Sequence, residues 1–223
     1  MAGERMTLDT AMKKRLIAAA ADTIFAHTEE LSELDRAIGD GDHGLNMKRG
    51  FEAVLADADN LAGKPLGEML KGAGTHLVMT IGGASGPLYG SLLLAMGKAA
   101  AEPPADIAGI ARILAEGVEA VSKRGKSDAG EKTMLEVLLP VSRRLSAAGS
   151  GEGVADLAAE LCAIADHGLE STRPMRATKG RASFLGERSI GHLDPGARSS
   201  QLLVHAICHV VAARRQAEKA GAA

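Results

Sequence analysis

Residues 7–27, TLDTAMKKRLIAAAADTIFAH, carry the clearest fold signal in this sequence. Their apolar side chains recur at spacings of three and four residues: Leu8, Met12, Leu16, Ala19, Ala20 and Ile24. An α-helix has about 3.6 residues per turn, so this spacing gathers the six side chains on one face. The stretch therefore predicts an amphipathic helix that packs against a neighbour.

The same spacing returns along the rest of the chain, interrupted by short breaks that glycine or proline marks. We expect seven further helices, over residues 45–58, 66–79, 88–100, 105–122, 131–145, 153–170 and 197–217. The alternation of β-branched residues that is typical of strands does not occur. Aromatic residues make up only 2% of the chain, which suits helices packed through small aliphatic side chains. The sequence predicts one all-α domain over residues 1–223, antiparallel because most connections are short.

Four of the breaks are unusual in length, glycine content or charge. These loops, residues 35–44, 82–87, 124–130 and 171–196, alternate with plain turns near 59–65, 101–104 and 146–152. In an up-and-down bundle, alternate loops emerge at the same end. We therefore expect the four unusual loops to meet at one end, where loops on a rigid scaffold commonly form a binding or catalytic site.

Charge and hydropathy exclude several classes of protein. The net charge is −2, from 26 basic and 28 acidic residues, with no basic block that would favour nucleic-acid binding. No run of about 18 apolar residues predicts a membrane span, and the polar first ten residues lack the apolar core of a signal peptide. We expect a cytoplasmic protein.

The two cysteines, Cys162 and Cys208, each fall in a helical pattern. His205 and His209 flank Cys208 at helical spacing, but no carboxylate or second cysteine lies close by in the sequence. The pattern favours small core side chains in a reducing compartment over a disulfide or a zinc site.

The loop Asp35-Arg36-Ala37-Ile38-Gly39-Asp40-Gly41-Asp42-His43-Gly44 has the strongest chemical signal. Its three carboxylates, on Asp35, Asp40 and Asp42, repel one another unless a cation lies between them. Oxygen ligands alone favour a hard ion, Mg²⁺ or Ca²⁺. The loop is not an EF-hand, because Leu45 and Phe51 stand where the glycine and the final glutamate belong. A glycine-aspartate turn that caps the next helix is the alternative interpretation.

Two glycine-rich segments could hold an anion. The helix that starts near Gly44 directs its first N–H groups into the acidic loop, a favourable place for phosphate. The segment 82–87, GGASGP, lets backbone N–H groups approach a phosphate closely, although it is not a Walker A loop. A glycine-rich helix break explains the second segment equally well.

The last loop, residues 171–196, is long and basic. It contains Arg176, Lys179, Arg181 and Arg188. Cations beside an acidic site suggest contacts with phosphate, and long irregular loops in compact domains are usually functional or disordered. A solvated basic loop is the alternative.

Four ordered motifs together resemble the L subunit, or L domain, of dihydroxyacetone kinases. They are residues 35–47 (the acidic loop and the three residues after it), the segment 82–89 (GGASGPLY), residues 130–134 (GEKTM) and residues 180–196 (GRASFLGERSIGHLDPG). The likeness covers nearly the whole chain. His43 stands where related fatty-acid kinase domains usually have threonine, which favours a sugar kinase.

The resemblance implies an eight-helix up-and-down barrel with a nucleotide, ADP or ATP, at one end. It also implies that Asp35, Asp40 and Asp42 chelate two Mg²⁺ ions that bridge the phosphates. Six residues would contact the phosphates: His43, Gly44, Leu45, Asn46, Ala84 and Ser85. Six others would enclose the rest of the nucleotide: Gly125, Met134, Arg181, Asp194, Pro195 and Gly196.

The same resemblance implies a phosphotransferase that is active only with a partner. A separate K subunit would hold the ketose, by default dihydroxyacetone, with erythrulose as another candidate. The phosphoryl group would come from ATP, or from ADP rephosphorylated by a phosphoenolpyruvate-dependent phosphocarrier. No catalytic side chain of this chain is required.

The sequence leaves other functions open. One is a nucleotide-loaded regulatory subunit that binds a transcription regulator, and another is a helical scaffold with an inert acidic loop. A homodimer is also left open.

Overall fold

The computed structural model describes residues 8–149 and 151–221, and every regular element in them is helical. Eight long helices correspond to the eight expected ones: α1 (Thr10–Ala26), α3 (His43–Ala56), α5 (Leu66–Thr80), α6 (Ser85–Ala99), α7 (Ile107–Gly125), α8 (Leu135–Ser146), α9 (Val154–Ser171) and α10 (Pro195–Gly221). Thr7, the expected start of the first helix, lies outside the described residues.

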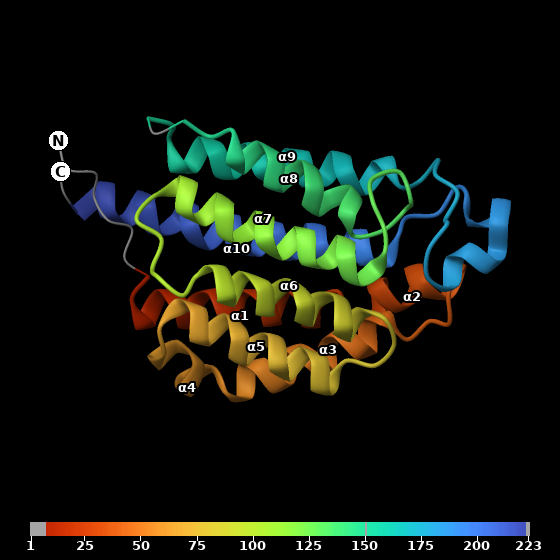
Figure 1. Ribbon diagram of the computed structural model, residues 1–223, viewed down its shortest axis with the longest axis horizontal. Helices are drawn as coiled ribbons and strands as arrows, with labels where there is room; N and C mark the ends of the chain where they lie inside the picture. Colours follow the sequence, from red (N-terminus) through yellow and green to blue (C-terminus); the bar gives the residue numbers. More distant parts are fainter. Residues whose placement is uncertain (1–7, 150, 222–223) are drawn as a thin grey trace.

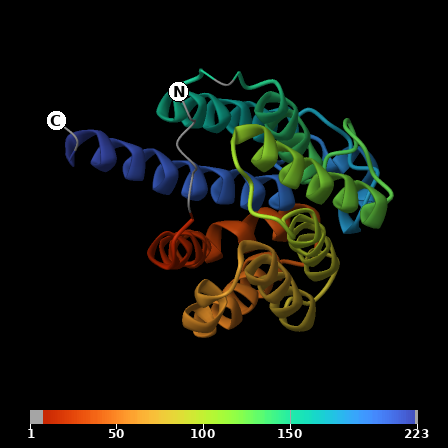
Figure 2. The ribbon, with the colours of Figure 1, turned by 60° about the vertical axis from the view of Figure 1, so that its left-hand side comes forward.

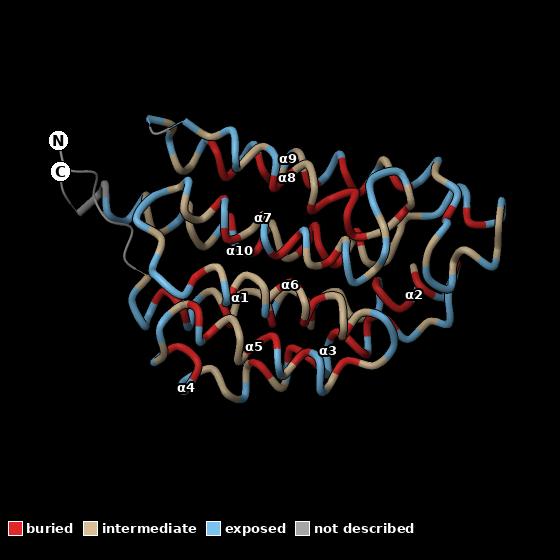
Figure 3. Tube along the Cα trace, in the orientation of Figure 1, coloured by how far each residue is buried: buried red, intermediate tan, exposed pale blue. Residues whose placement is uncertain are grey.

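The eight helices form a closed barrel. In the order α1, α3, α5, α6, α7, α8, α9 and α10, each helix packs against the next, and α10 returns to pack against α1. Figure 3 shows that the buried residues lie along the inward faces of the helices. The barrel interior also contains a largely apolar cavity of about 600 Å³, whose lining includes Arg214, Arg215 and Glu218 of α10. The all-α, up-and-down prediction is confirmed.

Glycine residues allow a close backbone contact between α5 and α6. A Cβ atom on Gly97 would lie 2.6 Å from the carbonyl oxygen of Gly67, and a Cβ on Gly67 would lie 2.7 Å from that of Gly97. Gly74 and Gly90 meet in the same way farther along the pair, with Gly90 O 3.1 Å from a Cβ on Gly74. Backbone therefore packs on backbone at two levels, which only glycine permits.

Three shorter elements were not expected: α2 (Thr28–Ile38), α4 (Ala58–Gly63) and the 3₁₀-helical segment η1 (Arg181–Ser189). The prediction of a loop over 35–44 is wrong at both ends: its first four residues form the last turn of α2, and His43 and Gly44 begin α3. The segment 171–196 is likewise less irregular than expected, because it contains η1 and the first residues of α10.

The expected helix start at residue 131 is also wrong, since α8 begins at Leu135. Backbone φ angles of 87° at Gly130 and 60° at Lys132 are incompatible with a right-handed helix. The Glu136 carboxylate compensates by accepting hydrogen bonds from the backbone N–H groups of Gly130, Glu131 and Lys132, at 3.0–3.1 Å.

The four unusual loops do meet at one end of the barrel (Figure 1). The start of α1, the end of α10 and the plain turns lie at the other end. None of the helices within residues 8–149 and 151–221 has both the length and the apolarity that crossing a bilayer requires.

Candidate functional site

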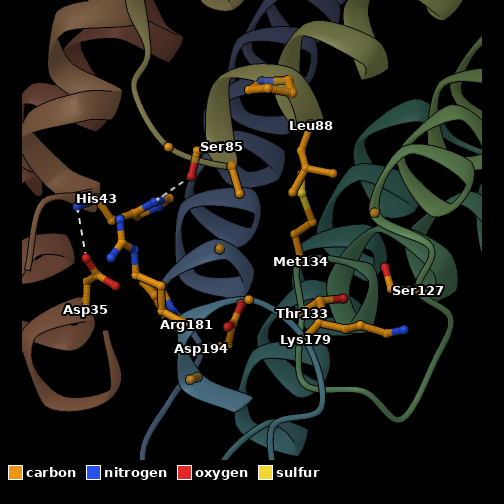
Figure 4. A pocket seen from close by; sticks show the side chains of 18 of the residues that line it. Asp35, His43, Ser85, Leu88, Ser127, Thr133, Met134, Lys179, Arg181 and Asp194 are labelled. Carbon is orange, nitrogen blue, oxygen red and sulfur yellow. Dashed lines mark hydrogen bonds between the residues drawn. The ribbon is translucent and has the colours of Figure 1, made fainter. Parts of the chain in front are cut away.

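A cavity of about 410 Å³ opens at the loop end of the barrel, and all four unusual loops line it. Figure 4 shows side chains from these loops facing one another across it. Pockets of this size suit a small ligand such as a nucleotide. Twelve of the fifteen predicted site residues line the cavity: Asp35, Asp40, Asp42, His43, Ala84, Ser85, Gly125, Met134, Arg181, Asp194, Pro195 and Gly196.

Gly44, Leu45 and Asn46 do not belong to that lining. Gly44 is buried against α2, where a Cβ atom would collide with the carbonyl oxygen of Thr28. Leu45 is 58% exposed, and Asn46 is buried beneath Gly82. Their predicted phosphate contacts stay predictions, and Gly44 has a structural role in bringing α3 close to α2.

The three carboxylates of the acidic loop converge on the cavity. One oxygen from each of Asp35, Asp40 and Asp42 lies within 4.8 Å of the others. Asp35 is buried in the last turn of α2, and its Oδ2 accepts hydrogen bonds from the backbone N–H groups of Asp42 (2.9 Å) and His43 (3.2 Å). These bonds fold the loop back over the helix end, so that the exposed Asp40 and Asp42 lie beside Asp35.

This donor set fits Mg²⁺. The ligand atoms are all carboxylate oxygens, which a small hard cation prefers, and the group includes no nitrogen or sulfur donor. Arg181 lies at the edge of the group and forms an ion pair with Asp40 at 3.0 Å. A guanidinium is thus available to phosphate oxygens on the same side of the cavity.

His43 is held as a neutral ring between two hydroxyl groups. Its Nδ1 lies 3.0 Å from Ser85 Oγ and its Nε2 lies 2.9 Å from Ser199 Oγ. Burial lowers the pKa of His43 to about 4, against the opposing effect of Asp35 and Asp42, so the ring is uncharged at neutral pH. His43 therefore positions Ser85 at the start of α6 rather than contributing charge.

A hydroxyl network extends from His43 into the barrel. The Tyr89 hydroxyl lies 2.7 Å from Ser199 Oγ and 2.9 Å from Ser200 Oγ, and it donates to the carbonyl of Gly196 at 3.3 Å. Burial raises the pKa of Tyr89 to about 12, so the phenol remains protonated. The network fixes α3, α6 and α10 relative to one another beneath the cavity.

The opposite wall is apolar and suits the base of a nucleotide. Leu88 and Met134 lie together on that side of Figure 4, with Ser127 of the α7–α8 loop beside them. Gly125, the last residue of α7, lies against Leu88, whose side chain would be 3.4 Å from a Cβ atom at Gly125. The left-handed backbone of Lys126 (φ 48°) turns the chain out of α7 at this point. A planar base in contact with aliphatic side chains gains from burial without needing a charge.

Asp194 closes the floor of the cavity. Its Oδ2 accepts a hydrogen bond from the backbone N–H of Ala197 at 2.7 Å, which caps α10. Burial raises the pKa of Asp194 to about 7, and this effect outweighs the hydrogen bond and the nearby charge of Lys132. The carboxyl group therefore changes its charge near neutral pH.

Sequence patterns missed the buried Lys132, which joins two of the loops. Its side chain is 1% exposed, and its ammonium donates to the carbonyls of Thr172 (2.7 Å) and His192. Ser199 and the Tyr89 hydroxyl were missed as well, because their partners lie more than 100 residues away in sequence. Of the four cations expected around the site, Lys179 and Arg181 line the cavity, whereas Arg176 and Arg188 do not.

Comparisons with known proteins agree with this geometry. The DAK2 domain family matches residues 37–209. The chain is 43% identical over 202 residues to "PEP-dependent dihydroxyacetone kinase 1, ADP-binding subunit DhaL" of Listeria innocua, covering 91% of this chain and 97% of that one. It is 40% identical to the corresponding ADP-binding subunit of Escherichia coli, covering 82% and 88% of the two chains.

Longer proteins contain a similar stretch. The chain is 33% identical to D-erythrulose kinase of Mycolicibacterium smegmatis, covering 92% of this chain and 36% of that protein. The solved dihydroxyacetone kinase of C. freundii superimposes with a TM-score of 0.71 at 21% identity, over 94% of this chain and 36% of that chain. A second structure of that kinase, in complex with AMP-PNP and Mg²⁺, gives a TM-score of 0.69. At this identity the two structures show the shared fold.

Proposed function

This chain belongs to the DAK2 domain family, as an ADP-binding L subunit of the dihydroxyacetone kinase type, and from that premise we propose that its loop-end cavity binds ADP or ATP with Mg²⁺. The observation that carries the proposal is the convergence of Asp35, Asp40 and Asp42 at a cavity that all four loops line. The protein is a phosphotransferase subunit that passes a phosphoryl group to a ketose on a separate K subunit.

Different residues of the cavity would contact different parts of the nucleotide. The three aspartates would hold two Mg²⁺ ions, and the chemistry that bound Mg²⁺ supplies is neutralisation of phosphate charge. Ser85 and the first N–H groups of α6 are available to phosphate oxygens, and His43 orients Ser85. Leu88 and Met134 cover the base.

We favour ADP as a resident group that a phosphoenolpyruvate-dependent phosphocarrier rephosphorylates. The relatives that match over most of their length are named as ADP-binding subunits of phosphoenolpyruvate- or phosphotransferase-system-dependent kinases. ADP that survives dialysis, together with turnover that requires the phosphocarrier, would support this route. Turnover with ATP and the K subunit alone would favour ATP as a consumed substrate.

The loop end also carries the apolar side chains that we assign to the K-subunit contact. Leu45, Met79 and Phe184 are 58%, 78% and 89% exposed, on α3, α5 and η1. Exposed apolar groups that gather near a polar site commonly mark a protein contact. A K subunit docked here would present its ketose to the open cavity.

The test of nucleotide binding is calorimetric titration of nucleotide-free protein with ADP and ATP, with and without Mg²⁺. We expect Mg²⁺-dependent binding that Asp40→Ala weakens about 100-fold, corresponding to about 2.8 kcal/mol. Asp59→Ala is the matched control, because Asp59 is an exposed, ion-paired aspartate in α4, away from the cavity. Failure of the folded wild-type protein to bind either nucleotide would overturn the proposal.

A further inference from the structure

A second group of metal-ligating side chains lies between α9 and α10, outside the nucleotide cavity. The thiol of Cys162 and one ring nitrogen each from His205 and His209 lie within 4.8 Å of one another. The two helices pack side by side along the barrel wall. We propose that Cys162, His205 and His209 bind one zinc-class transition-metal ion, with Asp166 orienting His205.

The spacing on each helix explains why the ligands converge. His205 and His209 are four residues apart on α10, so they share one helix face, as do Cys162 and Asp166 on α9. The two imidazole rings meet edge to face, with centroids 5.7 Å apart. Two histidines at this spacing are a recurrent zinc-binding arrangement on helices.

The ligand atoms are close to the separation that a metal requires. Tetrahedral zinc, with bonds of about 2.0 Å to nitrogen and 2.3 Å to sulfur, places its ligand atoms about 3.5 Å apart. Side-chain rotations at the half-buried Cys162 and the exposed His209 can bring the ligand atoms closer together by the remaining distance. Thiolate and imidazole together select zinc-like ions and do not suit Mg²⁺.

Asp166 provides the carboxylate that commonly hydrogen-bonds a metal-binding histidine and fixes the orientation of its ring. Its Oδ1 lies 2.8 Å from His205 Nε2 and accepts a hydrogen bond from the Gln201 side-chain amide at 2.6 Å. A carboxylate acceptor on one ring nitrogen leaves the other nitrogen as the lone-pair donor.

Three protein ligands and a solvent-exposed edge leave one coordination position for water or a small anion. The thiol of the neighbouring Cys208 hydrogen-bonds that of Cys162, but Cys208 itself is buried among apolar side chains of α8, α9 and α10, as the sequence predicts. The proposed ion therefore joins α9 to α10 at the barrel surface.

The experiment is titration of tag-free protein with Co²⁺ in excess Mg²⁺, followed by ultraviolet and visible absorption. Ligation of Co²⁺ by a thiolate produces a charge-transfer band that the carboxylates of the acidic loop cannot produce. We expect one equivalent to bind with this band and Zn²⁺ to displace it. Cys162→Ala and His209→Ala should each abolish the band. Because His209 is exposed, loss of the band in His209→Ala cannot be attributed to unfolding.

Two controls and a stability measurement complete the test. Cys208→Ala and His167→Ala, an exposed histidine of α9 outside the group, should keep the band. Free Zn²⁺ at 100 times its Kd should raise the unfolding midpoint by about 5–10 °C in the wild type and not in His209→Ala. Absence of the band, or a band that depends on Cys208 instead of Cys162, would overturn the proposal. The result is independent of nucleotide binding.

Discussion

Burial of the Asp194 carboxyl group at the cavity makes the stability of the folded protein depend on pH. Its folded pKa of about 7 lies above the usual value of 3.8, because burial penalises the charge. Below pH 4 the group is protonated in the folded and unfolded states and contributes nothing. Between pH 4 and 7 the folded state holds a proton that the unfolded state has lost, so stability falls as the pH rises.

Asp194→Asn removes this charge while keeping an oxygen that can cap α10. We expect the variant to gain stability over the wild type as the pH rises from 4 to 7.5, by an amount on the order of 3 kcal/mol. Urea unfolding of nucleotide-free protein at several pH values measures the difference. A constant difference between the two proteins across this range would contradict the buried, neutral state of Asp194.

At the scale of elements, the contact between α5 and α6 depends on glycine backbones. Gly67 and Gly97 each occupy the space where the other's side chain would lie, and the neighbouring atoms are rigid carbonyl oxygens. A methyl group added there cannot be accommodated by a side-chain rotation, so the two helices must separate. The contact explains part of the high glycine content, 27 residues, in an otherwise helical chain.

Gly97→Ala is expected to destabilise the protein by about 2 kcal/mol despite the higher helix propensity of alanine. Gly63→Ala is the matched control, because no atom lies within 4 Å of a Cβ at that position. The control should change stability by no more than about 0.5 kcal/mol or increase it. Denaturant unfolding of both variants is the measurement, and equal stabilities would show that α5 and α6 tolerate a wider separation.

Apolar spacing was sufficient to predict the eight barrel helices and the end of the barrel where the loops meet. It could not separate α2 from the acidic loop, because Asp35 is both a helical residue and a member of that loop. Nor could it find Lys132 or the Tyr89–Ser199 contact, since these interactions depend on how distant segments pack. Local patterns located the segments of the site, and tertiary contacts decide how their side chains are held.

In the whole molecule, the four unusual loops that line the cavity lie at one end of the barrel (the loop end), and the short plain turns that only connect helices lie at the other. The exposed Leu45, Met79 and Phe184 lie on elements at the loop end, whereas the opposite end consists of short turns and the outer ends of α1 and α10. Any partner that must reach the cavity has to approach from the loop end. Substitutions in contacts at the loop end should change catalysis by the complex without changing the affinity for the nucleotide.

Phe184→Ser tests this separation. Removal of an exposed aromatic side chain from a protein contact should weaken the apparent affinity for the K subunit about 10-fold, while the Kd for ADP stays within about twofold. Leu94→Ser on α6 is the control, since Leu94 is also partly exposed but lies in the half of α6 farther from the cavity. Loss of ADP affinity in Phe184→Ser would mean that η1 supports the cavity itself.

The position of the outer ends of α1 and α10 has a practical consequence. The first turn of α1 and the last turn of α10 leave the barrel at the end opposite the cavity, and α10 alone, at 27 residues, spans about 40 Å. A molecule attached to a sensor chip through a residue at the outer end of either helix would have its loops facing the flowing solution. Surface-based kinetic measurements can therefore use protein attached at these helix ends without blocking access of the nucleotide to the cavity.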